Sequence, residues 1–172
     1  MSYHEEEHED LEEDDQSIGE SLQDKYMTFI VAEEEYGIPV QNIFTIISAT
    51  PATVLPHSES YIDGILNLRG SIVPIVNSRK RFHKPAIELD SQACIIVVEH
   101  KNMLIGVLVD SIKDALDIPE DRISAPPNAR ITYRNEYVKQ IANMDNHIRR
   151  LLDMDSFFGT VGLVDERKAT SV

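Results

Sequence analysis

The stretch GILNLRGSIVPIV (residues 64–76) decides the fold of this chain, because two apolar runs in it are separated by a short polar break. The runs are residues 65–68 and 72–76, and Arg69-Gly70-Ser71 stands between them. Glycine readily adopts the positive φ that tight turns between antiparallel strands require. The stretch therefore predicts a β-hairpin whose turn contains Gly70.

Strand patterns continue on the N-terminal side of this hairpin. Residues 25–32 follow a period of two, with one apolar face made by Met27, Phe29 and Val31. Glu33-Glu34 is the expected turn into a return strand at 35–40, where Pro39 indicates an edge or a strand end. Residues 41–48 fit either a short helix or a strand, and 50–60 is expected to be a loop.

Short strands also dominate the C-terminal half. Residues 91–100 and 103–116 are expected to turn at Lys101-Asn102, the second segment being one long strand or two bent ones with a bulge at Gly106. Residues 136–144 and 147–154 should pair around Asp145-Asn146, before a short helix that ends at Gly159. Seven or more short strands joined by hairpins predict an all-β barrel or sandwich in two halves.

Charge is distributed very unevenly along the 172 residues. The chain has 30 Asp and Glu against 16 Lys and Arg, and eleven of the acids lie in residues 1–24, which contain no Lys or Arg. We expect a disordered acidic tail there, either a solubilising segment or an arm for a basic partner, and a flexible end at 161–172. The rest is nearly balanced (19 acids against 16 bases), which argues against nucleic-acid binding. No signal peptide or membrane-spanning run is recognisable, so a cytoplasmic protein is expected.

Catalytic and metal-binding patterns are not found in the sequence. The single cysteine, Cys94, lies in an apolar run and is expected to be buried and inert. His57, His83, His100 and His147 show no i, i+4 metal-ligand spacing, and His4 and His8 in the acidic tail are judged incidental because they lack fixed geometry. Asp153 and Asp155 fit the first turn of a helix better than a catalytic pair. We therefore predict a protein that is not an enzyme and has neither cofactor nor metal.

The central stretch closely resembles the signature of the chemotaxis coupling protein family, CheW. Matching residues in GILNLRGSIVPIVNSRKRF are Gly64, Asn67, Leu68, Arg69, Gly70, Ile72, Val73, Pro74, Arg79 and Phe82. EEYGI at 34–38 and LIGVLVDSIKDAL at 104–116 match two further family segments, so the resemblance covers about residues 25–158. It implies two packed five-stranded Src-homology-3-like barrels with short helices, forming one adaptor domain at 25–160.

The resemblance implies a non-catalytic adaptor that couples chemoreceptors to a CheA-type histidine kinase. The cytoplasmic tip of the receptor would lie in a groove and contact Val40, Ile43, Thr45 and Arg69. The kinase regulatory domain, which has the same fold, would bind near Gly64, and the motif residues Asn67, Leu68, Gly70 and Pro74 would have structural roles. The protein would associate with receptor arrays at the inner face of the membrane without inserting into it.

The chain departs from the family pattern at several positions. Thr45 and Ile47 replace an acidic residue and an arginine, and Asn77-Ser78 replaces Asp-Leu. Arg149-Arg150 lies in a strand that is normally more apolar, so at least one of the two should point to solvent. The uncharged 43–47 segment motivates an alternative, an adaptor in a non-flagellar pathway controlling surface motility or gene expression. A small-molecule sensor or enzyme is a third class, for which the sequence offers no phosphate-binding loop.

Overall fold

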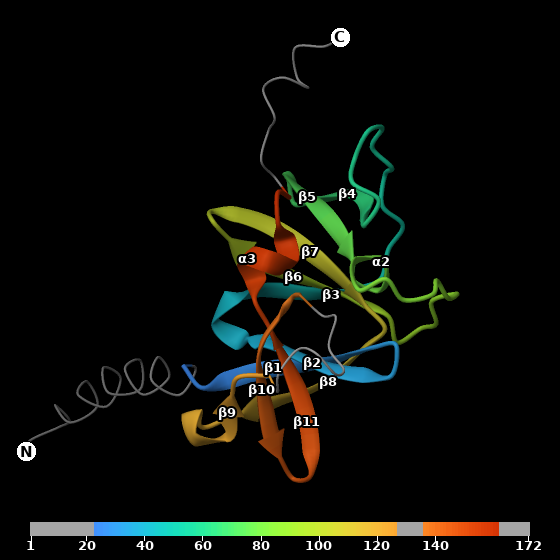
Figure 1. The fold of residues 1–172 in the computed structure, drawn as a ribbon. Helices are drawn as coiled ribbons and strands as arrows, with labels where there is room; N and C mark the ends of the chain where they lie inside the picture. Colours follow the sequence, from blue (N-terminus) through green and yellow to red (C-terminus); the bar gives the residue numbers. More distant parts are fainter. Residues whose placement is uncertain (1–22, 127–135, 162–172) are drawn as a thin grey trace, which may run out of the picture.

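Two β-sheets make up the protein (Figure 1), of which the computed structural model describes residues 23–126 and 136–161. The five-stranded sheet, uppermost in Figure 1, has the order β3 (Ile43–Ser48), β6 (Cys94–His100), β7 (Met103–Val109), β5 (Ser71–Asn77) and β4 (Ile62–Leu68). The six-stranded sheet has the order β8 (Ser111–Asp117), β1 (Lys25–Val31), β2 (Glu34–Pro39), β11 (His147–Leu152), β10 (Val138–Met144) and β9 (Ile123–Ser124). The predicted all-β fold is confirmed. One sheet has six strands instead of five, because the two residues of β9 add to β10.

Short helical segments connect the strands. They are the 3-10 turns η1 (Val40–Asn42) and η2 (Glu120–Arg122) and the α-helical turns α2 (Ser78–Arg81) and α3 (Met154–Phe158). Residues 41–48 thus contain both of the predicted alternatives, a helical turn followed by a strand. The expected disorder of 1–24 and flexibility of 161–172 fall almost entirely outside the described residues.

Tight two-residue turns set the register of four hairpins. Both turn residues have positive φ at Ala32-Glu33, Arg69-Gly70, Lys101-Asn102 and Asp145-Asn146. Such turns match the right-handed twist of the strands that they join. The first turn lies one residue earlier than predicted, since Glu34 already pairs with Val31.

The segment 103–116 forms two strands that belong to different sheets. β7 pairs with β6 and β5, the chain crosses over at Asp110, and β8 pairs with β1. The predicted bulge at Gly106 is wrong, because the β6–β7 register runs through it unbroken. A Cβ at Gly106 would lie 2.6 Å from Ile75 Cδ1 and 2.8 Å from Ile95 Cγ2, so glycine permits close packing here.

The main hydrophobic core lies between the two sheets and is shared by them. Tyr36 and Phe29 from the six-stranded sheet pack in it with β6 and β7 residues such as Ile96 and Ile105. Phe82, next to α2, stacks on Tyr36 with ring centroids 4.6 Å apart. Cys94 contacts this core but is only half-buried, so the prediction of a fully buried thiol is wrong.

Candidate functional site: partner-binding surfaces

The turn of the β4–β5 hairpin displays Arg69 to solvent. Arg69 and Gly70 have φ values of 51° and 87°, and the Gly70 N–H donates to Asn67 Oδ1 at 2.9 Å. Asn67 therefore closes the turn, while Leu68 points inward against a smaller core formed by β5, β6 and β7 residues. The turn fixes the backbone on both sides of Arg69 and leaves its guanidinium exposed.

The outward side of this hairpin is apolar. The register pairs Ile65 with Pro74 and Asn67 with Ile72, and paired residues share one face of a sheet. Ile72 is 67% exposed. Thr53 forms a β-bridge with Ile65, which brings Val54, 76% exposed, alongside β4. We call Val54, Ile65, Ile72 and Pro74 the hairpin face.

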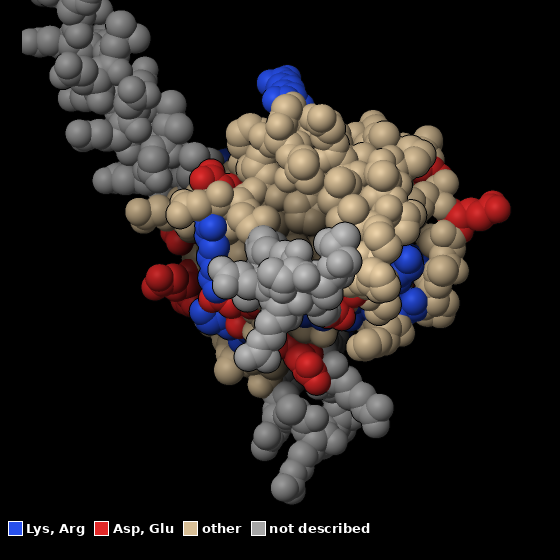
Figure 2. Space-filling model, turned by 90° about the horizontal axis from the view of Figure 1, so that it is seen from above, with Lys and Arg blue, Asp and Glu red and all other residues tan. Residues whose placement is uncertain are grey.

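Figure 2 views the molecule from the side of the five-stranded sheet, and most of the described surface seen there is uncharged. A hollow lies within this uncharged area (Figure 2). Exposed apolar side chains such as those of the hairpin face, gathered in a patch, are typical of sites where another protein binds.

Gly64 is buried under the chain that passes alongside β4. It has a φ of 145°, and a Cβ at this position would lie 2.1 Å from the Thr53 carbonyl oxygen. The β4–β5 register also shifts between Ile62 and Gly64. Whether Gly64 takes part in kinase binding, as predicted from the family resemblance, therefore depends on the chain segment that covers it. Gly64 controls how closely Thr53 and Val54 approach β4, and so it shapes the hairpin face.

Val40, Ile43 and Thr45 lie together at η1 and the start of β3, an edge strand of the five-stranded sheet. Ile43 packs against the main core, and Thr45 is half-buried. The most exposed apolar side chain here is Phe44, at 56%, which our sequence reading missed. Its alternation with Ile43 and Thr45 on a strand was the available signal.

Arg69 lies apart from these residues in strand order, because β3 and β4 occupy opposite edges of the sheet. Within the described residues no hydrogen bond or ion pair joins Arg69 to them. The structure thus groups three of the predicted receptor-binding residues and places the fourth on the hairpin turn.

A groove of about 260 Å³ runs along the six-stranded sheet next to the end of β6. We call it the inter-sheet groove. Its lining residues are Tyr26, Pro39, His100, Lys139, Gln140, Leu151, Leu152, Asp153, Met154 and Asp155. Pro39 directly precedes Val40, so the predicted receptor-binding segment begins at the rim of this groove. His100 Nε2 and Lys101 Nζ both lie 3.3 Å from Asp155 Oδ1 at one end.

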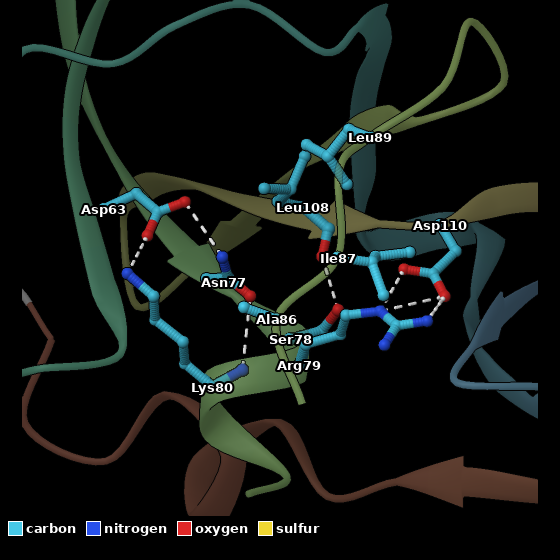
Figure 3. A pocket seen from close by; sticks show the side chains of 10 residues that line it. All are labelled: Asp63, Asn77, Ser78, Arg79, Lys80, Ala86, Ile87, Leu89, Leu108 and Asp110. Carbon is cyan, nitrogen blue, oxygen red and sulfur yellow. Dashed lines mark hydrogen bonds and ion pairs between the residues drawn. The ribbon is translucent and has the colours of Figure 1, made fainter. Parts of the chain in front are cut away.

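The two sequence signatures meet at an ion pair that the sequence did not reveal. Arg79 donates from Nε and Nη2 to Asp110, with the shortest distance 2.7 Å (Figure 3). Its Nη1 donates to the Pro85 carbonyl at 2.8 Å. Burial would raise the pKa of Asp110, but hydrogen bonds from Arg79 and the Ala32 N–H outweigh it, so this pKa is lowered. Asp110 thereby joins the crossover between sheets to α2 and to the β1–β2 turn.

Two of the residues that depart from the family pattern, Asn77 and Ser78, line a small pocket together with Arg79 and Asp110 (Figure 3). Asn77 donates to Asp63 at 3.0 Å and accepts from the backbone N–H of Lys80, whose Nζ lies 2.8 Å from Asp63. Ser78 is buried and donates to the Leu108 carbonyl. Asn77 and Ser78 therefore have local hydrogen-bond partners, and Asn77 caps α2 beside the ion pair of Arg79 with Asp110.

A second ion cluster is buried on the six-stranded sheet. Glu35 Oε1 accepts from Arg149 Nε at 3.0 Å and Oε2 from Lys113 Nζ at 3.2 Å. Burial would raise the pKa of Glu35, yet the hydrogen bonds from Lys113 and Arg149 lower it. Arg149 is 6% exposed, and Arg150 is half-buried near the Tyr36 ring. Neither side chain therefore points freely into solvent, contrary to our expectation that at least one would.

Most of the polar groups in these ion-paired clusters hold strands and turns of this chain together. In residues 23–126 and 136–161, no group of three or more His, Cys, Asp or Glu side chains could hold a metal ion. No helix in these ranges is long and apolar enough to cross a membrane. An exposed apolar hairpin face and a separate surface groove are features of the class of protein-interaction scaffolds.

Comparison with known proteins identifies the family. The CheW-like domain matches residues 25–161. The chain is 27% identical to the chemotaxis protein CheW of Klebsiella aerogenes, over 86% of this chain and 90% of that protein. It is 28% identical to CheW of Bacillus subtilis, over 77% and 85% of the two chains. The solved scaffolding protein TtCheW of Thermoanaerobacter tengcongensis superposes with a TM-score of 0.73 at 28% identity, covering 79% of this chain and 92% of TtCheW.

This protein belongs to the CheW-like family. The predicted resemblance is confirmed, and so is the prediction of a chemotaxis scaffold at the level of the family. The chemotaxis names of these relatives do not favour the alternative of a non-flagellar pathway.

Proposed function

We propose that this protein joins a chemoreceptor to a CheA-type histidine kinase, using two different surfaces. The kinase regulatory domain binds the hairpin face, and the helical tip of the receptor binds beside η1 and the inter-sheet groove. The observation that supports this most strongly is the hairpin face, where the apolar side chains of Ile72 and Val54 remain mostly exposed. Association with receptor arrays follows from the receptor contact.

The kinase surface has the properties of an interface core. Ile72, Val54 and Pro74 present rigid or branched apolar groups, and Ile72 and Val54 are largely exposed. Most of the described surface on the side of the five-stranded sheet carries no charged side chain (Figure 2). Charged residues are depleted from the centres of protein interfaces because their desolvation is costly. Gly64 contributes indirectly, by letting Val54 lie close to β4.

The receptor surface is suited to a helical hairpin. Helices dock by placing apolar side chains in a groove, and Val40 with Phe44 offers an apolar rim at the start of β3. Arg69, held outward by the turn, has a planar set of donors for a carboxylate or for carbonyls at a helix end.

Binding measurements with purified partners test both assignments. The wild-type chain is expected to bind a CheA regulatory domain, and Ile72→Lys is expected to weaken that binding at least about tenfold, as for a charge placed in an interface core. Arg69→Ala should reduce receptor-dependent kinase control and leave kinase-domain binding unchanged. No binding of the kinase domain by the wild-type protein would refute the proposed function. Unchanged receptor coupling in Arg69→Ala would refute only the role of Arg69.

A further inference from the structure

The helical turn α3 is too short to fix its own position. It contains only five residues, Met154–Phe158, and isolated helices below about 12–15 residues are marginal in water. Its two phenylalanines are buried in the main core. Its start, together with the preceding Asp153, lines the inter-sheet groove through Met154 and Asp155. Whatever holds the C-terminal end of α3 therefore also influences this groove wall.

The last four carbonyl groups of α3 all have partners, and one side chain provides two of them. The Gly159 N–H donates to the Asp155 carbonyl and the Val161 N–H to the Phe158 carbonyl, each at 2.9 Å. The Ser156 carbonyl accepts from Arg81 Nη2 at 3.1 Å, and the Phe157 carbonyl from Arg81 Nε at 2.8 Å. Carbonyls at a helix end need such partners from outside the helix, and a cation is favourable there.

Arg81 also contacts the aromatic rings at the start of one strand in each sheet. Its Cζ atom lies 4.0 Å from the ring centroid of Tyr61, which precedes β4, and 4.4 Å from that of Tyr137, which precedes β10. A flat guanidinium can stack on rings and donate two hydrogen bonds in its plane, which a lysine ammonium cannot do. A Cβ at Gly159 would lie 3.0 Å from Arg81 Nη2, so glycine leaves room for this arrangement.

From these contacts we infer that Arg81 is a positioning residue for the inter-sheet groove. It links the C-terminal end of α3 to α2 and to the strand starts at Tyr61 and Tyr137. Because α3 is short, fixing its C-terminal end also limits the movement of Met154 and Asp155 in the groove wall. The inference rests on the proposed binding of a receptor tip beside this groove. Arg81 touches neither proposed partner surface itself and acts through α3.

Two kinds of measurement on the full chain test this role. The variants are Arg81→Ala and Arg81→Lys, and the control is Arg122→Ala, which removes an exposed arginine from η2. Amide hydrogen exchange follows the N–H groups of Phe157, Gly159 and Val161. Calorimetry follows the binding of a chemoreceptor-tip fragment and of a CheA regulatory domain. Arg81→Ala should speed exchange at these amides about tenfold and weaken receptor-tip binding about tenfold, with kinase-domain binding within about twofold of wild type. Arg81→Lys should be intermediate, and Arg122→Ala should match wild type.

Each contrary outcome has a separate meaning. Unchanged exchange in Arg81→Ala would show that Arg81 does not hold α3, and the inference would be wrong. Faster exchange with unchanged receptor-tip binding would refute the effect of Arg81 on the groove. Equal losses of affinity for the receptor tip and the kinase domain would refute it too, because they would indicate a general structural role. If the wild-type protein bound no receptor tip, the proposed function would fail, while hydrogen exchange would still decide whether Arg81 holds α3.

Discussion

The β4–β5 hairpin and the outer side of the six-stranded sheet hold their strands together with different chemistry. In the hairpin, Asn67 closes the turn, Gly64 allows the chain at Thr53 to pass closely, and apolar side chains are left exposed. In the six-stranded sheet, a buried ion pair of Glu35 with Arg149 connects β2 to β11, and the more exposed Lys113 connects β8 to Glu35. The parallel pairing of β2 with β11 extends over only two residue pairs, so the side-chain contacts there reinforce a short ladder.

This difference separates a surface prepared for a partner from one that is already satisfied internally. Buried charges with their own partners have little to offer another protein, and removing one partner is costly. Exposed apolar side chains gain from being covered and lose little stability when they are changed. Mutations in the cluster of Glu35, Lys113 and Arg149 should therefore act on folding, and mutations on the hairpin face should act on binding.

The largest loss of stability is expected for Glu35→Leu. This change leaves the buried guanidinium of Arg149 without its carboxylate, which costs about 3–5 kcal/mol of unfolding free energy. Urea unfolding measures the loss. The double variant Glu35→Leu/Arg149→Met should recover most of it, because both charges are then removed. A loss below about 1 kcal/mol in the single variant, the range of surface pairs, would contradict the importance of the buried pair.

Gly64→Ala is expected to have a smaller but still large effect, about 2–3 kcal/mol, through strain and overpacking against the Thr53 carbonyl. Because the clash would displace Val54, kinase-domain binding should fall in the fraction that remains folded. Thermal unfolding and calorimetry together measure both effects. Gly70→Ala, where a Cβ meets no atom within 4 Å, is a matched control for a positive-φ glycine. Equal stability of Gly64→Ala and wild type would contradict the steric role.

Acidic pH should weaken the ion-paired region before it alters the hairpin face. The pKa values of Glu35 and Asp110 in the folded state are lowered from the ordinary values of 4.5 and 3.8. The contribution of each carboxylate to the free energy of unfolding is therefore complete above its ordinary pKa, and it is lost as the pH falls through the folded-state pKa. Urea unfolding from pH 7 down to about pH 3 should show a plateau followed by a decline. The Glu35→Leu/Arg149→Met variant should decline less steeply. An equally steep decline would assign the pH dependence to other carboxylates.

The smallest effect on stability is expected for Ile72→Lys, within about 0.5 kcal/mol, because the side chain is already 67% exposed. The same variant should lose kinase-domain binding, as proposed above. Chemical unfolding checks the first expectation. A loss above about 2 kcal/mol would show that Ile72 packs internally and would remove the contrast between the two regions.

Local sequence patterns predicted most of the fold. The two-residue periodicity located the main strands, and glycine and asparagine located the turns at Arg69-Gly70, Lys101-Asn102 and Asp145-Asn146. The predictions that failed depended on distant partners. The first turn shifted by one residue because β1 and β2 pair in full, and Gly106 proved to be a packing contact with Ile75 and Ile95 instead of a bulge.

By itself, the sequence determined the positions of most strands and hairpin turns along the chain, because these depend on residues close together in sequence. It also determined the family, through the motif NLRGSIVP. Only the tertiary structure decided that Arg79 meets Asp110, that Arg149 is buried against Glu35, and that Arg81 completes a helix 75 residues away. Each of these contacts joins segments from different strands or sheets. Spacing along the chain carries no information about such contacts, since the packing of the two sheets around a common core determines which side chains meet.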